Sequence, residues 1–185
     1  MARVVLTLGS NIDKERNLPA AVQLLARGVS VVAVSPVYET VPVGLREQPN
    51  FLNAAVLIET GQNAIELKDG LLADIERALR RERTADKNAP RTIDLDIALY
   101  DKAVFDYTPA DGRPRHVPDR DLLRFPHCLV PVADLLPDLP HPEMGQPLRR
   151  LADRLVADYT AAHGRVLWPR PDLVISTRNH TDHTD

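Results

Sequence analysis

The stretch TIDLDIALY, residues 92–100, alternates apolar and polar side chains. Successive side chains of a β-strand point to opposite faces, so this pattern predicts a strand with one face in the core. Strands are also predicted at residues 3–8, 29–40 and 51–60, which are rich in β-branched and other apolar residues. Together these stretches predict one sheet.

Two helices are expected between these strands. Asn17 is a candidate cap for the first, because apolar residues recur at helical spacing from Leu18 until Gly28 ends the pattern. The second is expected to run from about Asn63 to Glu82, with apolar residues on one face and arginines on the opposite face. The resulting order, βαββαβ, is typical of a ferredoxin-like α+β sandwich.

The second half of the chain contains more loop-forming residues. Residues 106–121 are dense in Pro, Gly and Asp, which predicts an excursion loop. Additional C-terminal helices are expected near residues 129–136 and 148–161. We expect residues 1–168 to form a single domain and residues 169–185 to form a flexible tail.

Composition and charge exclude several classes of function. The chain has 23 Lys and Arg against 26 Asp and Glu, a net charge of −3, which argues against binding nucleic acid or an anionic membrane. No stretch approaches the roughly 20 apolar residues of a membrane span. The only cysteine, Cys128, cannot form an internal disulfide. We therefore expect a cytoplasmic protein and, since nothing indicates an obligate interface, a monomer.

Two aspartates, Asp94 and Asp96, occupy polar positions in the alternating strand at residues 92–100. They are expected on the same face, roughly 7 Å apart, with the core fixing them from behind. Two fixed carboxylates repel each other unless a cation lies near both, and such oxygen ligands suit Mg²⁺ bound together with substrate phosphates. The alternative is that these aspartates simply form the solvated face of an antiparallel strand.

Basic residues gather just before this strand. Residues 80–91 contain five basic and two acidic residues, a local excess of three positive charges. Guanidinium groups bind phosphate oxygens and stabilise the charge of a transferred phosphoryl group. Arg91 immediately precedes the strand and is expected near the aspartates, although a solvated helix end would also carry such charges.

Several common catalytic motifs are absent from the sequence. It contains no GxxxxGK[ST], no GxGxxG, no HExxH and no glycine-framed serine. Its histidines are scattered, and no cysteine pair is present. A Walker-type, Rossmann, zinc or serine-hydrolase site is therefore not indicated.

Three segments resemble the 6-hydroxymethyl-7,8-dihydropterin pyrophosphokinase family of folate biosynthesis. They are LTLGSN, YETVPVGLREQPNFLNAAVLIET and IERALRRERTADKNAPRTIDLDIALY, and the resemblance covers about residues 4–140. It implies a ferredoxin-like fold and an enzyme that transfers a pyrophosphoryl group from ATP to the hydroxymethyl oxygen of the pterin. It also implies two Mg²⁺ ions and release of AMP.

The resemblance also implies roles for individual residues. Asp94 and Asp96 match the metal-binding carboxylates, and Arg81 and Arg91 match the arginines that engage the transferred phosphates. The candidates for ATP binding are Glu76, Arg83, Lys87 and Ile97, with Arg115 and Arg120 as further candidates. The candidates for pterin binding are Thr40, Val41, Val43, Phe51, Asn53 and His127.

Three positions depart from the usual pattern of that family. Asn88 stands where a tryptophan is common, Asp119 where a histidine is expected, and His127 where a second pterin-stacking phenylalanine is expected. Arg115, Arg120 or Arg124 could compensate for the histidine at the ATP phosphates. These departures leave two alternatives open. One is a weakly active or non-catalytic relative that binds pterin or nucleotide, and the other is a different Mg²⁺-dependent phosphotransferase or hydrolase.

Overall fold

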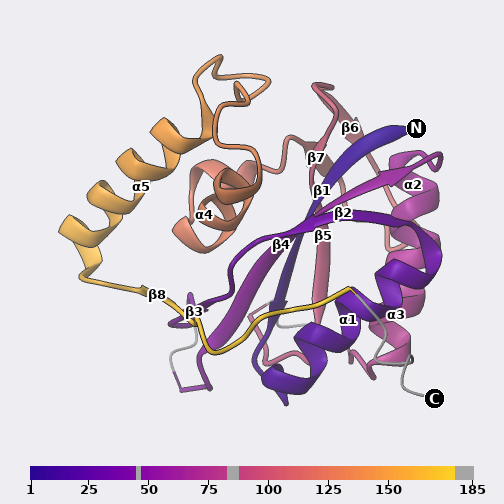
Figure 1. Cartoon of the computed structure of the whole chain (residues 1–185), viewed down its shortest axis with the longest axis horizontal. Coiled ribbons are helices and arrows are strands. Elements are labelled where there is room, and N and C mark those ends of the chain that lie inside the picture. The colour runs from indigo at the N-terminus through magenta and orange to yellow at the C-terminus, as the bar shows by residue number, and fades with distance from the viewer. Residues whose placement is uncertain (45–46, 83–87, 178–185) are drawn as a thin grey trace, which may run out of the picture.

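An antiparallel sheet forms the centre of the molecule, and helices pack on both of its faces (Figure 1). This computed structural model describes residues 1–44, 47–82 and 88–177. The strand order is β5-β1-β4-β3-β8, and β2 also pairs with β4. The expected mixture of α and β structure is confirmed. The strands of the sheet are β1 Ala2–Ser10, β2 Ser30–Val34, β3 Tyr38–Thr40, β4 Phe51–Thr60, β5 Asp94–Tyr100 and β8 Leu167–Pro169.

The strand predicted at residues 51–60 is confirmed as β4, and its residues 52–60 pair with β1. The strand predicted at residues 29–40 is instead divided into β2 and β3. Pro36 has no N–H group with which to pair with a neighbouring strand. Between the two strands, Ser35 Oγ accepts a hydrogen bond from Ala55 N of β4 (2.8 Å).

Strand β5 lies at the edge of the sheet, beside β1. The register between the two strands shifts after Ile97 and skips Ala98, which indicates a β-bulge. Leu99 therefore packs on the opposite face of the sheet from Leu95 and Ile97. The strict alternation predicted for residues 92–100 is wrong at this point, because periodicity alone does not reveal an inserted residue.

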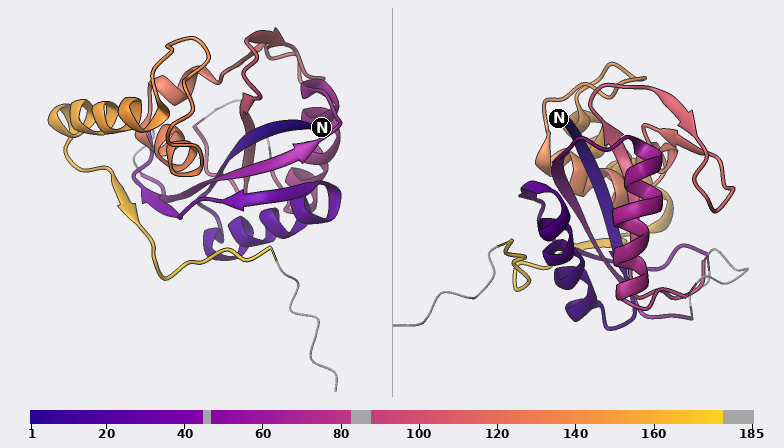
Figure 2. Two further views of the ribbon diagram at one scale, coloured as in Figure 1. Left: turned by 45° about the horizontal axis from the view of Figure 1, so that its top comes forward. Right: turned by 90° about the vertical axis from the view of Figure 1, so that its right-hand side faces the viewer.

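Helix α1, Lys14–Gly28, covers one face of the sheet together with the helical segments that follow β4 (Figure 2). It begins earlier than expected, with Asp13 at the N-cap position. Asn17 lies inside the helix, where its Nδ2 donates to Ile12 O (2.7 Å). The predicted end at Gly28 is confirmed.

The helix predicted from Asn63 to Glu82 is shorter and interrupted. Asn63 caps helix α2, Ala64–Leu67, through a capping box with Glu66. A π-helical turn, η1 (Lys68–Leu72), and helix α3, Ala73–Ala78, follow. The chain then turns at Arg80, which has φ of 57°. This turn directs Arg81 inward, where its side chain is only 11% exposed, instead of along an outer helix face.

Helices α4, Pro126–Leu135, and α5, Leu148–His163, pack on the opposite face, close to the ranges expected for C-terminal helices. The prediction of a continuous loop at residues 106–121 is wrong, because this range contains regular structure. It contains part of strand β6, Phe105–Tyr107, strand β7, Arg115–Val117, and the start of the 3₁₀ turn η2, Arg120–Leu123. None of the helices in the described ranges has the length and apolarity needed to cross a membrane.

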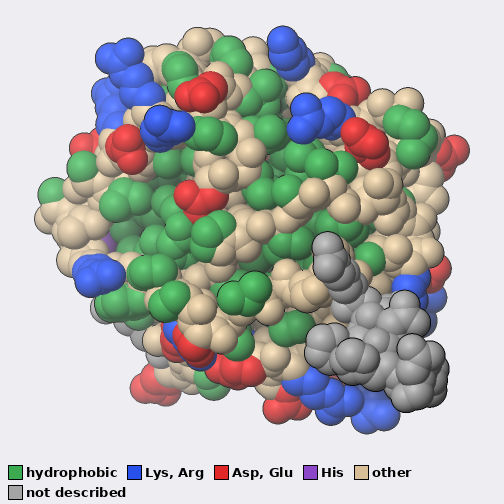
Figure 3. Space-filling view, viewed as in Figure 1, with side chains coloured by type: hydrophobic (Ala, Val, Ile, Leu, Met, Phe, Trp, Pro, Cys, Tyr) green, Lys and Arg blue, Asp and Glu red, His purple; other side chains and the backbone are tan. Residues whose placement is uncertain are grey.

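A segment that we call the C-terminal strap, residues 167–175, begins as β8 at the outer edge of β3 and then runs toward helix α1 (Figure 1). Arg170 N donates to Val37 O (2.8 Å), and its guanidinium contacts Glu39 (2.8 Å). Leu173 and Ile175 pack against the core. Residues 169–175, expected as the start of a flexible tail, thus have defined contacts, and residues 178–185 lie outside the described ranges. On the face seen in Figure 3, apolar side chains gather centrally and charged ones lie mostly toward the margin.

Candidate active site

Two cavities meet at Asp96, near the start of β5. The larger, of about 470 Å³, is lined by Asp94, Asp96 and Arg91. The structure also brings all the pterin candidates together around it, although they come from distant parts of the chain. They are Thr40, Val41, Val43, Phe51, Asn53 and His127.

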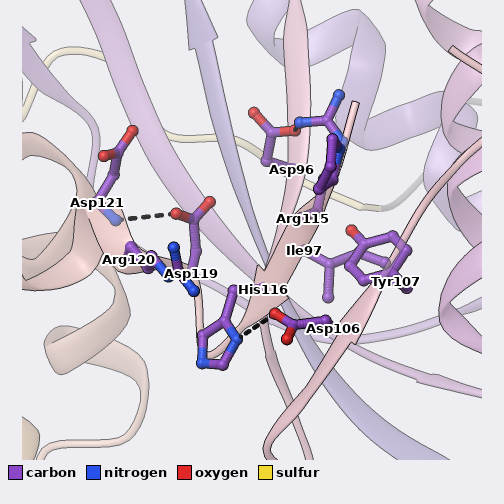
Figure 4. A pocket seen from close by; sticks show the side chains of 10 residues that line it. Asp96, Ile97, Asp106, Tyr107, Arg115, His116, Asp119, Arg120 and Asp121 are labelled. Carbon is purple, nitrogen blue, oxygen red and sulfur yellow. Dashed lines mark hydrogen bonds and ion pairs between the residues drawn. The ribbon is translucent and has the colours of Figure 1, made fainter. Parts of the chain in front are cut away.

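The smaller cavity, of about 260 Å³, is lined by three ATP candidates, Ile97, Arg115 and Arg120 (Figure 4). Asp96 and Asp121 are the residues that line both cavities. A cation or phosphate held at Asp96 would therefore be accessible from either side. Sequence reasoning did not single out Asp121, which lacks a distinctive motif.

Glu76, expected to contact ATP, is not among the residues lining either cavity. It is buried, and its Oε1 accepts a hydrogen bond from Leu95 N (3.3 Å). It also lies 3.6 Å from Lys68 Nζ. This placement differs from the expectation, because Glu76 caps the backbone of the edge strand.

Arg81 also lies outside the walls of both cavities. Its Nη1 donates to Ile93 O (2.9 Å), and its Nη2 lies 3.9 Å from Asp94 Oδ2. Arg83 and Lys87, the remaining ATP candidates, lie outside the described residues.

Arg91 lies between the aspartates and the pterin candidates, and it contacts both groups. Its Nη1 lies 2.5 Å from Asp94 Oδ2, and its guanidinium carbon lies 5.7 Å from the centroid of the Phe51 ring. Its backbone N donates to Asn11 Oδ1 (2.8 Å), which fixes the chain just before β5. Arg91 is thus placed as predicted, close to the metal candidates.

Asp96 contacts two cations. Its Oδ1 lies 2.9 Å from Lys68 Nζ and 3.3 Å from Arg115 Nη1. Burial by itself would raise the pKa of Asp96, but the charges of Lys68 and Arg115 outweigh burial and lower the pKa to about 2. Asp96 is therefore ionised at neutral pH. Sequence reasoning missed Lys68 because nothing in its local pattern distinguishes it from a surface lysine.

The carboxylate pair suits a cation that arrives with a nucleotide. Within the described ranges, no group of three or more His, Cys, Asp or Glu side chains is arranged to hold a metal. Asp94 and Asp96 nevertheless both line the larger cavity, and Asp96 also lines the smaller one, so their carboxylate oxygens could bind a cation there. Mg²⁺ commonly binds one or two carboxylates and completes its shell with phosphate oxygens and water. The residues present therefore fit Mg²⁺.

The wall of the larger cavity offers an amide and flat rings. Asn53 Nδ2 donates to Thr40 Oγ1 (2.7 Å), which fixes the buried amide. A Cβ at Gly9 would lie only 3.1 Å from Asn53 Oδ1, so glycine there permits the close approach of β1. His127 stacks on Phe125 with ring centroids 5.4 Å apart. Burial lowers the pKa of His127 to about 4, so its imidazole is neutral at pH 7.

Hydrogen bonds that the sequence did not predict join two loops beside the larger cavity. Asn11 Nδ2 donates to Gln48 Oε1 (2.9 Å), and Gln48 Nε2 donates to Asn88 O (3.0 Å). Gln48 and Asn88 both line this cavity. The backbone of Asn88 thus links its loop to the loop before β4, whatever side chain the position carries.

Asp119 lines the smaller cavity and accepts a hydrogen bond from Asp121 N (2.9 Å) at the start of η2. Burial raises the pKa of Asp119 to about 7, and the negative charge of Asp96 adds to this rise. An unfolded aspartate titrates near 3.9, so the folded protein retains this proton over a range in which the unfolded chain has lost it. Stability therefore falls as the pH rises through this range.

We expect Asp119→Asn to stabilise the protein more at pH 8 than at pH 5, by about 2 kcal/mol, because the amide avoids the cost of a buried charge and can still cap η2. Urea unfolding at both pH values, without divalent cations, measures the difference. Asp153→Asn, on the exposed side of α5, controls for loss of a carboxylate. Equal effects at both pH values would show that Asp119 is already ionised at pH 5.

A carboxylate pair flanked by arginines, with one of the two carboxylates lining two adjoining cavities, is typical of enzymes that transfer phosphoryl groups. Residues 5–137 match the family model described as 7,8-dihydro-6-hydroxymethylpterin-pyrophosphokinase (HPPK). The chain belongs to this family.

Similar proteins agree with this assignment. The chain is 42% identical over 142 residues to a 2-amino-4-hydroxy-6-hydroxymethyldihydropteridine pyrophosphokinase of Methylorubrum extorquens, covering 75% of this chain and 85% of the relative. It is 38% identical over 153 residues to the folic acid synthesis protein fol1 of Schizosaccharomyces pombe, covering 81% of this chain but only 20% of the relative. The chain therefore spans only about a fifth of fol1.

The fold is similar to that of HPPK-DHPS from Plasmodium falciparum. The TM-score is 0.73 at 13% sequence identity, and the match covers 89% of this chain and 46% of that one. At this identity the likeness shows the fold alone, and the chain spans less than half of that protein.

Proposed function

We propose that this chain transfers the pyrophosphoryl group of ATP to the hydroxymethyl group of 6-hydroxymethyl-7,8-dihydropterin and releases AMP, a step of folate biosynthesis. The main support is the position of Asp96, where the cavity of the pterin candidates meets that of the ATP candidates. A group passed between two substrates must be reachable from both. Membership of the HPPK family and the names of its curated relatives support the same reaction.

The larger cavity is proposed to hold the pterin. Phe51 and His127 offer flat surfaces to the ring, and neutral imidazole avoids placing a charge against it. Asn53 hydrogen-bonds the polar edge of the ring, with its amide held by Thr40. Val41 and Val43 add apolar contacts from the loop after β3.

The smaller cavity is proposed to hold ATP. Ile97 provides apolar surface, while Arg115 and Arg120 bind phosphate oxygens in bidentate fashion. Arg83 and Lys87 are expected to add further phosphate contacts. Asp94 and Asp96 would hold two Mg²⁺ ions, which would neutralise phosphate charge during transfer.

The residues at the junction position the reacting atoms. The hydroxymethyl oxygen attacks the β-phosphorus of ATP and loses its proton to water, as the bond from that phosphorus to the oxygen of AMP breaks. Arg81 and Arg91, released from Asp94, stabilise the charge on the moving phosphates. The contact between Gln48 and Asn88 keeps two loops together over the larger cavity, where they limit the entry of competing water.

We also infer that the fold is a ferredoxin-like sandwich. The central strands β1 and β4 are flanked by β5 on one side and by β2 and β3 on the other. We further infer that the domain extends to about Ile175, beyond the expected boundary at residue 168; the contacts of the C-terminal strap support this extension. We expect the protein to act as a monomer in the cytoplasm, where its single cysteine, Cys128, stays reduced.

Separation of the products tests the proposed reaction. The chain is incubated with ATP, Mg²⁺ and 6-hydroxymethyl-7,8-dihydropterin, and the nucleotides are resolved by chromatography. AMP and a pyrophosphorylated pterin are expected in equal amounts. ADP or inorganic phosphate would indicate a different phosphotransferase or hydrolase. Binding of both substrates without AMP formation would indicate a non-catalytic relative.

Asn53→Ala is expected to raise the KM for the pterin roughly 10-fold to 100-fold, because hydrogen bonds to a buried amide are lost. The KM for ATP should change little, since Asn53 lines only the larger cavity. Initial rates with each substrate varied in turn measure both constants. Gln23→Ala, an exposed amide on α1, is the control. A rise confined to the KM for ATP would remove Asn53 from the pterin site.

A further inference from the structure

Two side chains cap the free edge of β5 at Leu95. Strand β5 ends the sheet, so some of its backbone groups lack a neighbouring strand. Leu95 N donates to Glu76 Oε1 (3.3 Å), and Leu95 O accepts a hydrogen bond from Lys68 Nζ. Lys68 and Glu76 also lie within 3.6 Å of each other. We call this pair the edge clamp.

Lys68 extends the edge clamp to Asp96. Its ammonium can donate three hydrogen bonds, and it lies beside the oxygens of Leu95, Asp96 and Glu76. With only 4% of its side chain exposed, Lys68 has little freedom to move. The ammonium group of Lys68 therefore holds the Asp96 carboxylate in place through Oδ1.

The contacts of Asp96 are divided unevenly between its two oxygens. Lys68 and Arg115 both contact Oδ1. The residues that the structure describes make no hydrogen bond or ion pair with Asp96 Oδ2. One carboxylate oxygen meets the Arg115 guanidinium while the other points away from it (Figure 4). This second oxygen is available at the junction of the two cavities.

A local irregularity of the helix brings Lys68 to this position. Lys68 begins the π-helical turn η1, and Ala73 N donates to Lys68 O, five residues earlier. Such turns accommodate one residue more than a regular α-helical turn and often occur at functional sites. The expectation of an uninterrupted helix at residues 63–82 did not include this change of phase.

We propose that Lys68 is a positioning residue for Asp96, which it fixes through Oδ1 so that Oδ2 is presented to the divalent cation. This inference rests on the proposed function. Lys68 touches neither substrate and acts through the metal ligand. The simpler alternative is that Lys68 only neutralises buried Glu76 and closes the sheet edge.

A charge-balanced double variant, Lys68→Met with Glu76→Gln, separates these alternatives. It removes one positive and one negative charge, so the net charge near Asp96 is unchanged and no buried Glu76 is left unpaired. Lys102→Met, an exposed lysine after β5, is the matched control. Glu76→Gln alone tests the clamp with Lys68 still present, and Lys68→Arg tests whether another cation can replace the ammonium.

Two measurements are made on each variant. Electron paramagnetic resonance of free Mn²⁺ gives its affinity in the presence of a non-transferable ATP analogue, and initial rates give kcat and both KM values. For the double variant we expect Mn²⁺ affinity and kcat each to fall roughly 10-fold to 100-fold, as for other partners of metal ligands. The KM for the pterin should be unchanged, and Lys68→Arg should recover part of kcat.

Two outcomes bear on different claims. A folded double variant with the Mn²⁺ affinity and kcat of the native chain would overturn the positioning role and leave the edge clamp purely structural. If the native chain forms no AMP, the proposed function fails, but the Mn²⁺ comparison still decides whether Lys68 positions Asp96. Circular dichroism and thermal unfolding establish that each variant is folded.

Discussion

Asp96→Asn is expected to lower the rate of AMP formation by roughly 10³-fold or more, because the variant loses the charge of the proposed metal ligand at the point where the two cavities meet. Asparagine has nearly the same shape, and Lys68 still has Glu76 beside it, so the fold should persist. Product assays measure the rate, and thermal unfolding checks the fold.

Asp153→Asn is the control for this variant, since it removes a carboxylate on the exposed side of α5. It should form AMP at the rate of the native chain. If Asp96→Asn kept a rate within about 10-fold of the native chain, the metal assignment would be wrong, because loss of a single group that stabilises transition-state charge costs more than this.

Arg91→Ala is expected to lower kcat by roughly 10²-fold or more, because the guanidinium that we propose to stabilise the charge of the transferred phosphates is removed. Arg91→Lys should recover only part of this loss, since lysine keeps the charge but lacks the planar fork. Initial rates at saturating ATP and pterin give kcat for both variants. Arg77→Ala, an exposed arginine on α3, is the control.

The position of Arg91 also allows a different result. Its guanidinium lies 5.7 Å from the Phe51 ring centroid, in the wall of the proposed pterin cavity. If Arg91→Ala raised the KM for the pterin and left kcat unchanged, Arg91 would act through substrate binding and not through the phosphates. The two substitutions therefore distinguish the roles of charge, shape and ring contact.

Local patterns predicted those parts of the fold in which local and global preferences agree. The apolar density of residues 51–60 corresponds to β4, and period-two alternation correctly placed Asp94 and Asp96 on the wall of one cavity. The bulge at Ala98 could not be predicted in the same way, because it depends on the register with β1. The β6–β7 hairpin was also not predicted, because turn-forming residues lie around and within its short strands.

The candidate site was predictable to the extent that a family motif covers it. The motif at residues 90–97 and the segment at residues 48–55 contain six of the candidates that line the two cavities. Lys68 and Asp121 were missed, because their importance arises from contacts across the fold and not from neighbouring residues. Glu76 was placed at ATP by resemblance, whereas the contact with Leu95 N depends on β5 being an edge strand.

The C-terminal strap has a consequence for self-association. By pairing with β3 it occupies backbone groups that another chain could otherwise use to extend the sheet. The strand it contributes, β8, has three residues and ends at Pro169, which lacks an N–H and makes a poor template for further pairing. Continued growth of the sheet into aggregates is thereby discouraged at this end, even in a concentrated solution.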